Sequence, residues 1–196
     1  MKRVLVVDDE PITRMDLREM LQELEFDVVG EAGDGFDAVE LCRSLRPDVV
    51  LMDVKMPVFD GLAAAETILR EDLAGCVVLL TAFSDREVID RANAAGVTGY
   101  IVKPVEERLL LPTIEVALAQ SQRLRQSREE AAKAVSRLND SKLIHRAQAV
   151  LAQRAGISES SAYQELRRLS MDKRVPMAVL ARSILEQEPR RKDKPC

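Results

Sequence analysis

The first 102 residues alternate between short apolar runs and longer segments in which apolar residues have helical spacing. The runs are apolar at nearly every position, which is typical of strands buried on both faces of a parallel sheet. Strands are expected at residues 3–7, 26–31, 48–53, 76–81 and 98–102. Helices are expected at residues 12–24, 36–45, 61–69 and 86–95, and a further helix begins near Glu106.

This alternation of strands and helices predicts the fold class of the first part of the chain. Five β–α units in roughly 110 residues favour an α/β fold with a doubly wound, five-stranded parallel sheet of the flavodoxin-like kind. In such folds the ligand lies at the carboxyl ends of the strands. Functional side chains are therefore expected immediately after the apolar runs.

The strand pattern stops after Pro112. Residues 113–138 lack Gly and Pro and are rich in helix-forming residues, which predicts a long helix. A seven-residue repeat favours a parallel dimeric coiled coil, although two positions of its second seam are polar, and the alternative is a single amphipathic linker helix. The first seam is Ala117, Leu124, Ala131 and Leu138, the second contains Ile114 and Val135, and the interruptions are Ser121 and Arg128.

Three short helices are expected in residues 142–187. The first, 143–155, ends at Gly156, Ser158 caps the second, and Pro176 opens the third in its first turn. The fold is thus expected to continue from the sheet into a long helix and a small all-α unit. The predicted divisions are an α/β domain at 1–111, a helical linker at 112–138, a three-helix domain at 139–188 and a basic flexible tail at 189–196.

Composition narrows the class of protein. With 46% hydrophobic and 32% charged residues the chain resembles an ordinary globular protein. No run approaches the ~20 apolar residues of a membrane span, and the first apolar run is too short for a signal peptide, so a cytoplasmic protein without a membrane partner is expected. Cys42, Cys76 and Cys196 lack metal or disulfide spacing and are expected to be free thiols.

The net charge of −4 hides two oppositely charged parts of the chain. Residues 1–111 carry 12 Lys and Arg against 23 Asp and Glu, whereas residues 138–196 carry 12 against 7. The basic end is therefore the candidate for binding a polyanion such as nucleic acid.

Acidic residues follow two of the expected strands. Asp8 and Asp9 come directly after the first strand, and Asp53 ends the third. Neighbouring strand ends converge in this fold, so the three carboxylates are expected in one pocket, where their mutual repulsion raises their pKa values. A hard divalent cation relieves that repulsion, and Mg²⁺ suits a site that also holds water and a phosphate oxygen. Thr81 and Lys103 end the next two strands and add a hydroxyl and an ammonium group.

These residues lie in motifs that resemble the receiver domain of two-component response regulators. The likeness covers residues 1–108 in the expected order. It is carried by Val6-Val7-Asp8-Asp9-Glu10-Pro11, Met52-Asp53-Val54-Lys55-Met56-Pro57 with Asp60-Gly61, Leu80-Thr81-Ala82 and Lys103-Pro104.

The resemblance implies a phospho-acceptor role for Asp53, with the phosphoryl group coming from a phosphohistidine of a sensor histidine kinase. It implies Mg²⁺ as cofactor and no independent enzyme, only Mg²⁺-dependent self-phosphorylation and dephosphorylation. The implied metal site comprises Asp8, Asp9, Asp53 and the carbonyl of Lys55. The implied phosphoryl-binding and switch residues are Thr81, Ala82, Lys103 and Tyr100, with Pro104 in the cis form; Tyr100 as a packing residue alone is the alternative.

The tail resembles the ANTAR domain, a small three-helix module that binds RNA in transcription antitermination. The likeness covers residues 138–187 and is carried by residues 158–171 and 178–181. Residues 8–14 and 169–174 make the whole chain similar to ethanolamine-utilisation antiterminators. The family usually has Ala-Lys-Gly in its first helix, where this chain has Ala147-Gln148-Ala149.

A basic surface with one aromatic residue is expected in this domain, because an aromatic ring can stack on an unpaired RNA base. The alternatives are a solvated charged face and a tyrosine that belongs to the core. The RNA-binding candidates are Arg146, Tyr163, Arg167, Arg168, Lys173 and Arg174.

Together these features predict a response regulator that dimerises on phosphorylation and binds RNA hairpins in a leader transcript to cause antitermination. A DNA-binding transcriptional response regulator is the main alternative, because residues 156–169 also resemble a turn followed by a recognition helix. A tail that binds only a partner protein is the third possibility.

Overall fold

The computed structural model describes residues 1–82 and 86–186, and the expected basic tail at 189–196 lies outside these ranges. The chain divides into two compact units, Met1–Gln126 and Ser127–Cys196. Each unit is described by itself below.

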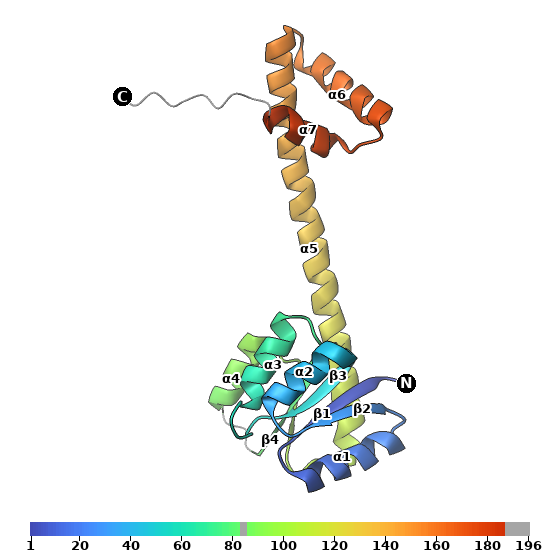
Figure 1. Ribbon diagram of the computed structural model, residues 1–196, viewed down its shortest axis with the longest axis vertical. Helices are drawn as coiled ribbons and strands as arrows, with labels where there is room; N and C mark the ends of the chain where they lie inside the picture. The colour runs from blue at the N-terminus through green and yellow to red at the C-terminus, as the bar shows by residue number, and fades with distance from the viewer. Residues whose placement is uncertain (83–85, 187–196) are drawn as a thin grey trace, which may run out of the picture. The chain divides into compact units, whose positions relative to one another are not determined.

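A five-stranded parallel sheet forms the centre of the first unit (Figure 1). The strand order β2-β1-β3-β4-β5 is that of the flavodoxin-like fold, so the predicted fold class is confirmed. Every expected strand, and each of the four helices expected between the strands, begins and ends within one residue of the observed position. The strands are β1 (Arg3–Val7), β2 (Asp27–Ala32), β3 (Val49–Asp53), β4 (Cys76–Thr81) and β5 (Gly99–Val102).

Helices cover both faces of this sheet. The helices are α1 (Pro11–Glu23), α2 (Gly35–Leu45), α3 (Gly61–Arg70), α4 (Arg86–Ala95) and α5 (Glu107–Ala155). Apolar residues of α2, α3 and α4 pack on one face, including Cys42, Ile68 and Ala92. Leu21 of α1 and Ile114 of α5 pack on the other. Strands β3 and β4 are buried along their whole length, which explains why their sequences are continuously apolar.

Two of the three cysteines lie in this unit. Cys42 and Cys76 are buried and unpaired, and burial raises the pKa of both thiols to about 12. The expectation of buried free thiols is confirmed for this pair, and Cys196 lies outside the described residues.

Helix α5 is one continuous helix of 49 residues. The prediction that a separate short helix begins near residue 143 is therefore wrong. Residues 139–142, Asn-Asp-Ser-Lys, include three weak helix formers but neither Gly nor Pro, so nothing ends the helix there. Pro112 lies inside the helix near its beginning. It lacks an N–H, but the helix continues past it because the following residues pack against the sheet.

The first part of the seven-residue repeat belongs to the core of the first unit. Ile114 and Ala117 are fully buried against the sheet. Ser121 is also buried, and its hydroxyl donates a hydrogen bond of 2.5 Å to the carbonyl oxygen of Gly75. The polar residue that interrupts the seven-residue repeat thus connects α5 with the loop before β4.

Arg125 extends the same attachment by one turn. One nitrogen of its guanidinium lies 2.5 Å from a carboxylate oxygen of Asp72 and donates to the carbonyl oxygen of Ala74 at 2.6 Å. Only the part of the seven-residue repeat that follows Ser121 is therefore available to pack against a second helix. Leu124, Val135 and Leu138 are exposed, as that reading requires.

Replacing Ser121 with leucine tests this assignment. A leucine improves the heptad pattern, yet we expect Ser121→Leu to lower the free energy of unfolding by about 2 kcal/mol, because it overpacks a buried site and leaves the Gly75 carbonyl without its donor. Denaturant unfolding measures the change. Gln122→Leu at the exposed neighbour is the control and should stay within about 0.5 kcal/mol of wild type. A gain in stability from Ser121→Leu would restore the coiled-coil assignment of this residue.

The second unit contains the end of α5 followed by α6 (Glu159–Lys173) and α7 (Met177–Glu186). Ala147, Leu166 and Ala181, one from each helix, form its buried centre. Gly156 has a φ of 64°, which suits the residue that follows a helix. The predicted cap of α6 is confirmed, since the Ser158 hydroxyl accepts a bond from the N–H of Ser161 at 3.1 Å.

The start of α7 differs by one residue from the prediction. Pro176 lies just before the helix and its carbonyl accepts the N–H of Leu180 at 3.3 Å, so it is a cap rather than a first-turn residue. In the ranges that the structure describes, no helix combines the length and the apolar character needed to cross a bilayer.

Candidate functional site

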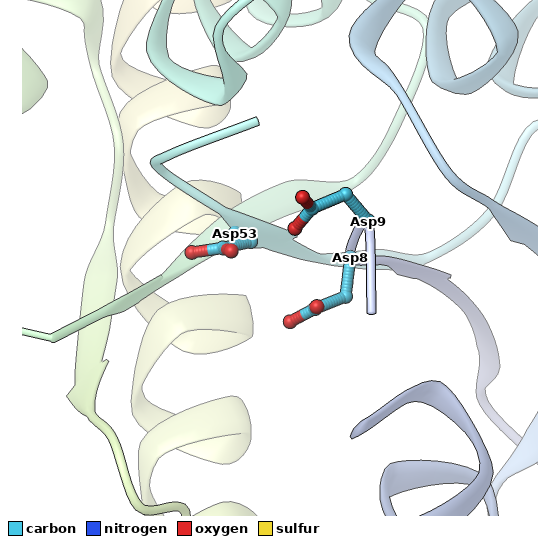
Figure 2. A group of neighbouring side chains, drawn as sticks. All are labelled: Asp8, Asp9 and Asp53. Atoms are coloured by element: carbon cyan, nitrogen blue, oxygen red, sulfur yellow. The ribbon is translucent and has the colours of Figure 1, made fainter. Parts of the chain in front are cut away.

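Three carboxylates meet at the carboxyl ends of β1 and β3 (Figure 2). Asp8 and Asp9 follow β1, and Asp53 ends the adjacent strand β3. One oxygen from each side chain lies within 4.8 Å of the other two. Asp8 is fully buried and Asp53 nearly so, whereas Asp9 is exposed. Clustered carboxylate oxygens with one open side are a ligand set that suits a hard divalent cation such as Mg²⁺, which keeps part of its water shell.

The ammonium group of Lys103 links two of these carboxylates. Its nitrogen lies 2.6 Å from an oxygen of Asp8 and 2.9 Å from an oxygen of Asp53. Lys103 follows β5, and its backbone N–H donates to the Thr81 carbonyl at the end of β4 at 2.8 Å. The Lys103–Pro104 peptide bond is cis. Because β5 ends at the same edge of the sheet as β1 and β3, it places the Lys103 cation beside Asp8 and Asp53.

Charge interactions in this pocket shift two pKa values. Burial raises the pKa of Asp53, as does the nearby Asp8, and these effects exceed the opposing effect of Lys103. Burial alone would lower the pKa of Lys103, but its hydrogen bonds to Asp8 and Asp53 raise it overall. Lys103 therefore remains protonated, and positive charge added at the site would favour the ionised form of Asp53.

Asp8 is held from several sides. Its second carboxylate oxygen accepts the backbone N–H of Glu10 at 3.0 Å, and its carbonyl oxygen accepts a guanidinium N–H of Arg14 at 2.7 Å. The two oxygens of its side chain thus have separate protein partners, Glu10 and Lys103. Asp53 likewise has Lys103 at 2.9 Å from one oxygen and the Lys55 N–H at 3.4 Å from the other, so the exposed Asp9 is the carboxylate most open to a metal ion.

The loop after β3 brings backbone groups to the site. The N–H of Lys55 points to a carboxylate oxygen of Asp53 at 3.4 Å, so the Lys55 carbonyl belongs to the turn beside the carboxylates. Asp60 caps α3 by accepting the N–H of Ala63 at 2.7 Å. A Cβ atom on Gly61 would lie 1.7 Å from the carbonyl oxygen of Asp53. Sequence reasoning assigned no role to Gly61, but only glycine permits this close approach.

Thr81 and Tyr100 line one cavity beside the pocket. Thr81 is buried at the end of β4, Ala82 follows it in an exposed position, and Tyr100 on β5 has 49% of its surface exposed. The cavity has a volume of about 460 Å³ and also contacts Ala92 of α4 and Val116 of α5. Since the ring of Tyr100 lies at an open cavity, it is not a core residue here.

The six RNA-binding candidates all lie in the second unit. Arg146 is exposed on α5, Tyr163, Arg167 and Arg168 are exposed on α6, and Lys173 and Arg174 lie at the end of α6. Tyr163 is 44% exposed, so the alternative that it is a core residue does not hold. Arg168 forms two hydrogen bonds to Glu165, at 2.6 and 3.0 Å.

Gln148, at the position where the ANTAR family usually has lysine, contacts the next helix. Its side-chain amide donates to the Glu159 carbonyl at 3.0 Å. Gln148 therefore connects α5 with the first turn of α6, a contact that no periodicity in the sequence could reveal.

Two family models match the chain. The model of the response regulator receiver domain matches residues 4–115, and the model of the ANTAR domain matches residues 132–185. Their division agrees with the two kinds of site described above, an acidic pocket followed by a basic helical unit.

Similarity to individual proteins covers both parts. The chain is 43% identical over 185 residues to the transcriptional regulatory protein PdtaR of Mycobacterium tuberculosis (strain ATCC 25618 / H37Rv), covering 94% of this chain and 90% of that protein. The chemotaxis protein CheY of Halobacterium salinarum is 38% identical over 117 residues, which are 60% of this chain and 97% of that protein. The narrower likeness to ethanolamine-utilisation antiterminators stays a prediction.

Solved structures match the first unit. The signal receiver domain of a modulated diguanylate cyclase from Desulfovibrio desulfuricans G20 has a TM-score of 0.58 and 30% identity, over 62% of this chain and 97% of that one. The receiver domain of the sensor histidine kinase PA1611 from Pseudomonas aeruginosa PAO1 has a TM-score of 0.54 and 26% identity, over 60% and 98%, and was solved with a magnesium ion in its active-site cleft. The chain belongs to the response regulator family and combines a receiver domain with an ANTAR domain.

Proposed function

We propose that this chain is a phosphorylation-controlled regulator that binds RNA hairpins and causes transcription antitermination. The observation that carries the proposal is the Asp53 carboxylate, which lies 2.9 Å from Lys103 and beside Asp8 and Asp9, in a chain that also has an ANTAR domain. The acidic pocket receives the signal and the helical unit acts on RNA. The name of the mycobacterial relative, a transcriptional regulatory protein, supports an action on transcription.

In the proposed input step, Asp53 attacks a phosphohistidine of a sensor histidine kinase. The bond between phosphorus and the imidazole nitrogen breaks as a bond to the Asp53 carboxylate oxygen forms. Asp9, Asp53 and the Lys55 carbonyl would hold Mg²⁺, with Asp8 assisting through water, and the ion would neutralise charge on the transferred group. The magnesium ion in the PA1611 receiver supports this assignment. The chain is a phospho-acceptor switch and has no other catalytic activity.

Lys103 and Thr81 stabilise the product in this proposal. The Lys103 ammonium moves from the carboxylates to the new phosphoryl oxygens, since charge-assisted hydrogen bonds to phosphate are strong. The Thr81 hydroxyl and the Ala82 N–H bind the same group. Tyr100 then turns into the cavity that it shares with Thr81, which changes the surface formed by α4, β5 and α5.

Dimerisation connects this surface to RNA binding. Two phosphorylated copies associate through the receiver domain and the exposed seam of α5, and the dimer offers two ANTAR domains to paired hairpins. Linking two weak sites can raise the overall affinity by about 10²–10⁴ without any new contact. The proposed partners are thus a sensor histidine kinase, a second copy of the chain and leader RNA, all in the cytoplasm.

A transcription assay tests the function as a whole. RNA hairpins that bind the phosphorylated protein are first selected from a pool with randomised loops. A pair of the selected hairpins is then placed before a terminator. Phosphorylated protein should increase readthrough, whereas Asp53→Asn protein should not. Competition with duplex DNA separates this function from DNA binding. If duplex DNA abolishes the readthrough caused by the phosphorylated protein and competing hairpin RNA does not, the proposal is excluded.

A further inference from the structure

The peptide group between Asp8 and Asp9 joins two of the three carboxylates of the acidic pocket. Its carbonyl oxygen accepts a guanidinium N–H of Arg14 at 2.7 Å. The backbone N–H of Asp8 donates to the carbonyl oxygen of Ala32 at 3.1 Å, so both backbone groups of Asp8 have partners. Arg14 therefore holds the plane of the peptide from which the Asp9 side chain departs.

The direction of the Asp9 side chain depends on this peptide. The two carboxylate oxygens of Asp8 are held by Glu10 and Lys103. In the described ranges, 1–82 and 86–186, no protein group donates a hydrogen bond to the carboxylate of Asp9, which is exposed and directed toward Asp53 (Figure 2). The backbone of Asp9 therefore decides where this carboxylate points.

Arg14 reaches the peptide because of its place in α1. It lies in the first turn of the helix, where its backbone N–H donates to the Glu10 carbonyl at 3.2 Å. Side chains of a helix lean toward its N-terminal end, which here is the end of β1. A cation near the N-terminus of a helix opposes the helix dipole. The charge of Arg14 thus does not stabilise α1, and its guanidinium serves the strand end instead.

A glutamate of the edge strand β2 fixes the guanidinium from its other side. Glu31 is paired with Val6 of β1, which belongs to the core beneath α1, so the two side chains share that face of the sheet. One oxygen of Glu31 lies 3.5 Å from Nε of Arg14, and the other lies 3.1 Å from a guanidinium nitrogen of Arg18. Glu31 thus orients Arg14 and offsets its charge beside a cation site.

We propose that Arg14 is a positioning residue for the binding of magnesium. It contacts the backbone rather than the metal, and it holds the peptide between Asp8 and Asp9 so that the Asp9 carboxylate stays directed at the site. This inference rests on the Mg²⁺ site of the proposed function. Loss of a residue that orients a metal ligand typically weakens metal affinity by about 10–100-fold.

Positioning and simple charge predict opposite effects of removing Arg14. A guanidinium near a cation site repels the cation, so its removal as a charge alone would strengthen Mg²⁺ binding. Its removal as the donor to the Asp8 carbonyl would weaken binding, because Asp9 then spends less time directed at the site. The sign of the change in affinity therefore separates the two roles.

Titration with Mn²⁺ measures this sign directly. Mn²⁺ takes the same kinds of oxygen ligand as Mg²⁺, and electron paramagnetic resonance detects the free ion. In the full-length, unphosphorylated protein, Arg14→Met should keep the packing of the side-chain stem and weaken Mn²⁺ binding about tenfold. The proposal is wrong if this variant binds Mn²⁺ as tightly as wild type or more tightly.

Arg18 provides the matched control. Arg18→Met removes the same charge from the other partner of Glu31 but leaves the Asp8 carbonyl with its donor. It should bind Mn²⁺ within about twofold of wild type, as expected for the loss of an exposed ion pair. Equal weakening by the Arg14 and Arg18 substitutions would attribute the effect to charge around Glu31 and overturn the role of the Asp8 contact.

A lysine variant keeps the test decisive if Arg14→Met does not fold, which thermal unfolding in the presence of a chelator shows. Arg14→Lys retains the charge and one nitrogen donor, which can serve the Asp8 carbonyl or Glu31 but not both. Its affinity for Mn²⁺ should lie about threefold below that of wild type, because the carbonyl contact is kept only part of the time. Where both variants fold, lysine should bind Mn²⁺ more tightly than methionine, and the reverse order would show that charge decides.

The rate of phosphorylation gives a second readout. With a small acyl phosphate as donor, Arg14→Met should need about tenfold more Mg²⁺ for half of its maximal labelling rate. The rate at saturating Mg²⁺ should stay within about twofold of wild type, because the bound ion itself then holds Asp9 in place. A rate that is lowered equally at every Mg²⁺ concentration would contradict the proposal, since it indicates a general loss of structure.

Failure of this inference differs from failure of the proposed function. If wild-type protein binds neither Mn²⁺ nor Mg²⁺, the metal site itself is wrong, and the proposed input step fails with it. If wild type binds the metal and the Arg14 variants bind it equally well, the metal site and the function stand, and only the positioning role of Arg14 is lost.

Discussion

Asp53→Asn protein is expected to accept no phosphoryl group. The amide has no anionic oxygen to attack phosphorus and cannot complete the ligand set with Asp9, although it preserves size and shape. Wild-type protein incubated with Mg²⁺ and a small acyl phosphate should gain one phosphoryl group, measured by mass spectrometry of the intact chain. The loss in Asp53→Asn should be at least about a hundredfold in rate, since positioning and charge neutralisation remain but no nucleophile does.

A nearby carboxylate provides the control for this substitution. Asp60 belongs to the same loop, but its side chain caps α3 through the N–H of Ala63. Asparagine is also a good cap, so Asp60→Asn should fold and accept the phosphoryl group at close to the wild-type rate. Chelation of Mg²⁺ should prevent labelling of both the wild-type and the Asp60→Asn protein. Labelling of Asp53→Asn at Asp8 or Asp9 would show that the acceptor is misassigned.

The acidic pocket could be predicted from sequence because few physical rules determine it. Strands that are apolar on both faces indicate a parallel sheet, and the carboxyl ends of such strands meet at one edge. Asp9 and Asp53 are therefore neighbours although 44 positions separate them. Lys103 is also close to both acids for this reason, but its shorter contact is to Asp8 rather than to Asp53. The strand order alone does not decide which carboxylate the flexible lysine prefers.

Contacts between distant loops and helices are not visible in sequence patterns. Ser121 reads as a fault in a heptad repeat, and its partner is the backbone of Gly75 in another loop. Gln148 reads as a lost basic residue, and it binds the Glu159 carbonyl. In both cases a side chain pairs with a backbone group, which carries no signal in residue type at the partner position. Helix α5 also continues across residues 139–142, where the sequence analysis expects a break, because these residues include neither Gly nor Pro to end it.

The exposed part of α5 is the basis of the second prediction, a loss of dimerisation. Residues 126–139, beyond the contacts of Arg125 with Asp72 and Ala74, are exposed on all sides of the helix, so no tertiary packing within the described residues supports this stretch. A pair such as Glu129 and Lys133, with charged atoms 3.9 Å apart, contributes only a few tenths of a kcal/mol. Leu124, Val135 and Leu138 are apolar and exposed on the seam. A second copy that covers this seam would supply the missing burial.

Charged substitutions on the seam are therefore expected to prevent dimerisation. The double variant Leu124→Glu and Leu138→Glu should remain monomeric after phosphorylation in sedimentation experiments. Its affinity for a two-hairpin RNA should fall by about 10² or more, because bivalent binding is lost. Its affinity for a single hairpin should not change, since neither position is among the RNA-binding candidates.

A matched pair of substitutions on the outer side of the same helix makes the result specific. Gln122→Glu with Ser136→Glu introduces the same two charges at exposed positions away from the seam, and should dimerise and bind like wild type. A phosphorylated seam variant that still dimerises would place the interface on the receiver domain alone. Wild-type protein that stays monomeric when phosphorylated yet binds two hairpins tightly would exclude the dimer altogether, because the affinity would then have to come from one ANTAR domain. The single and paired hairpins thus separate the strength of each RNA site from the gain due to association.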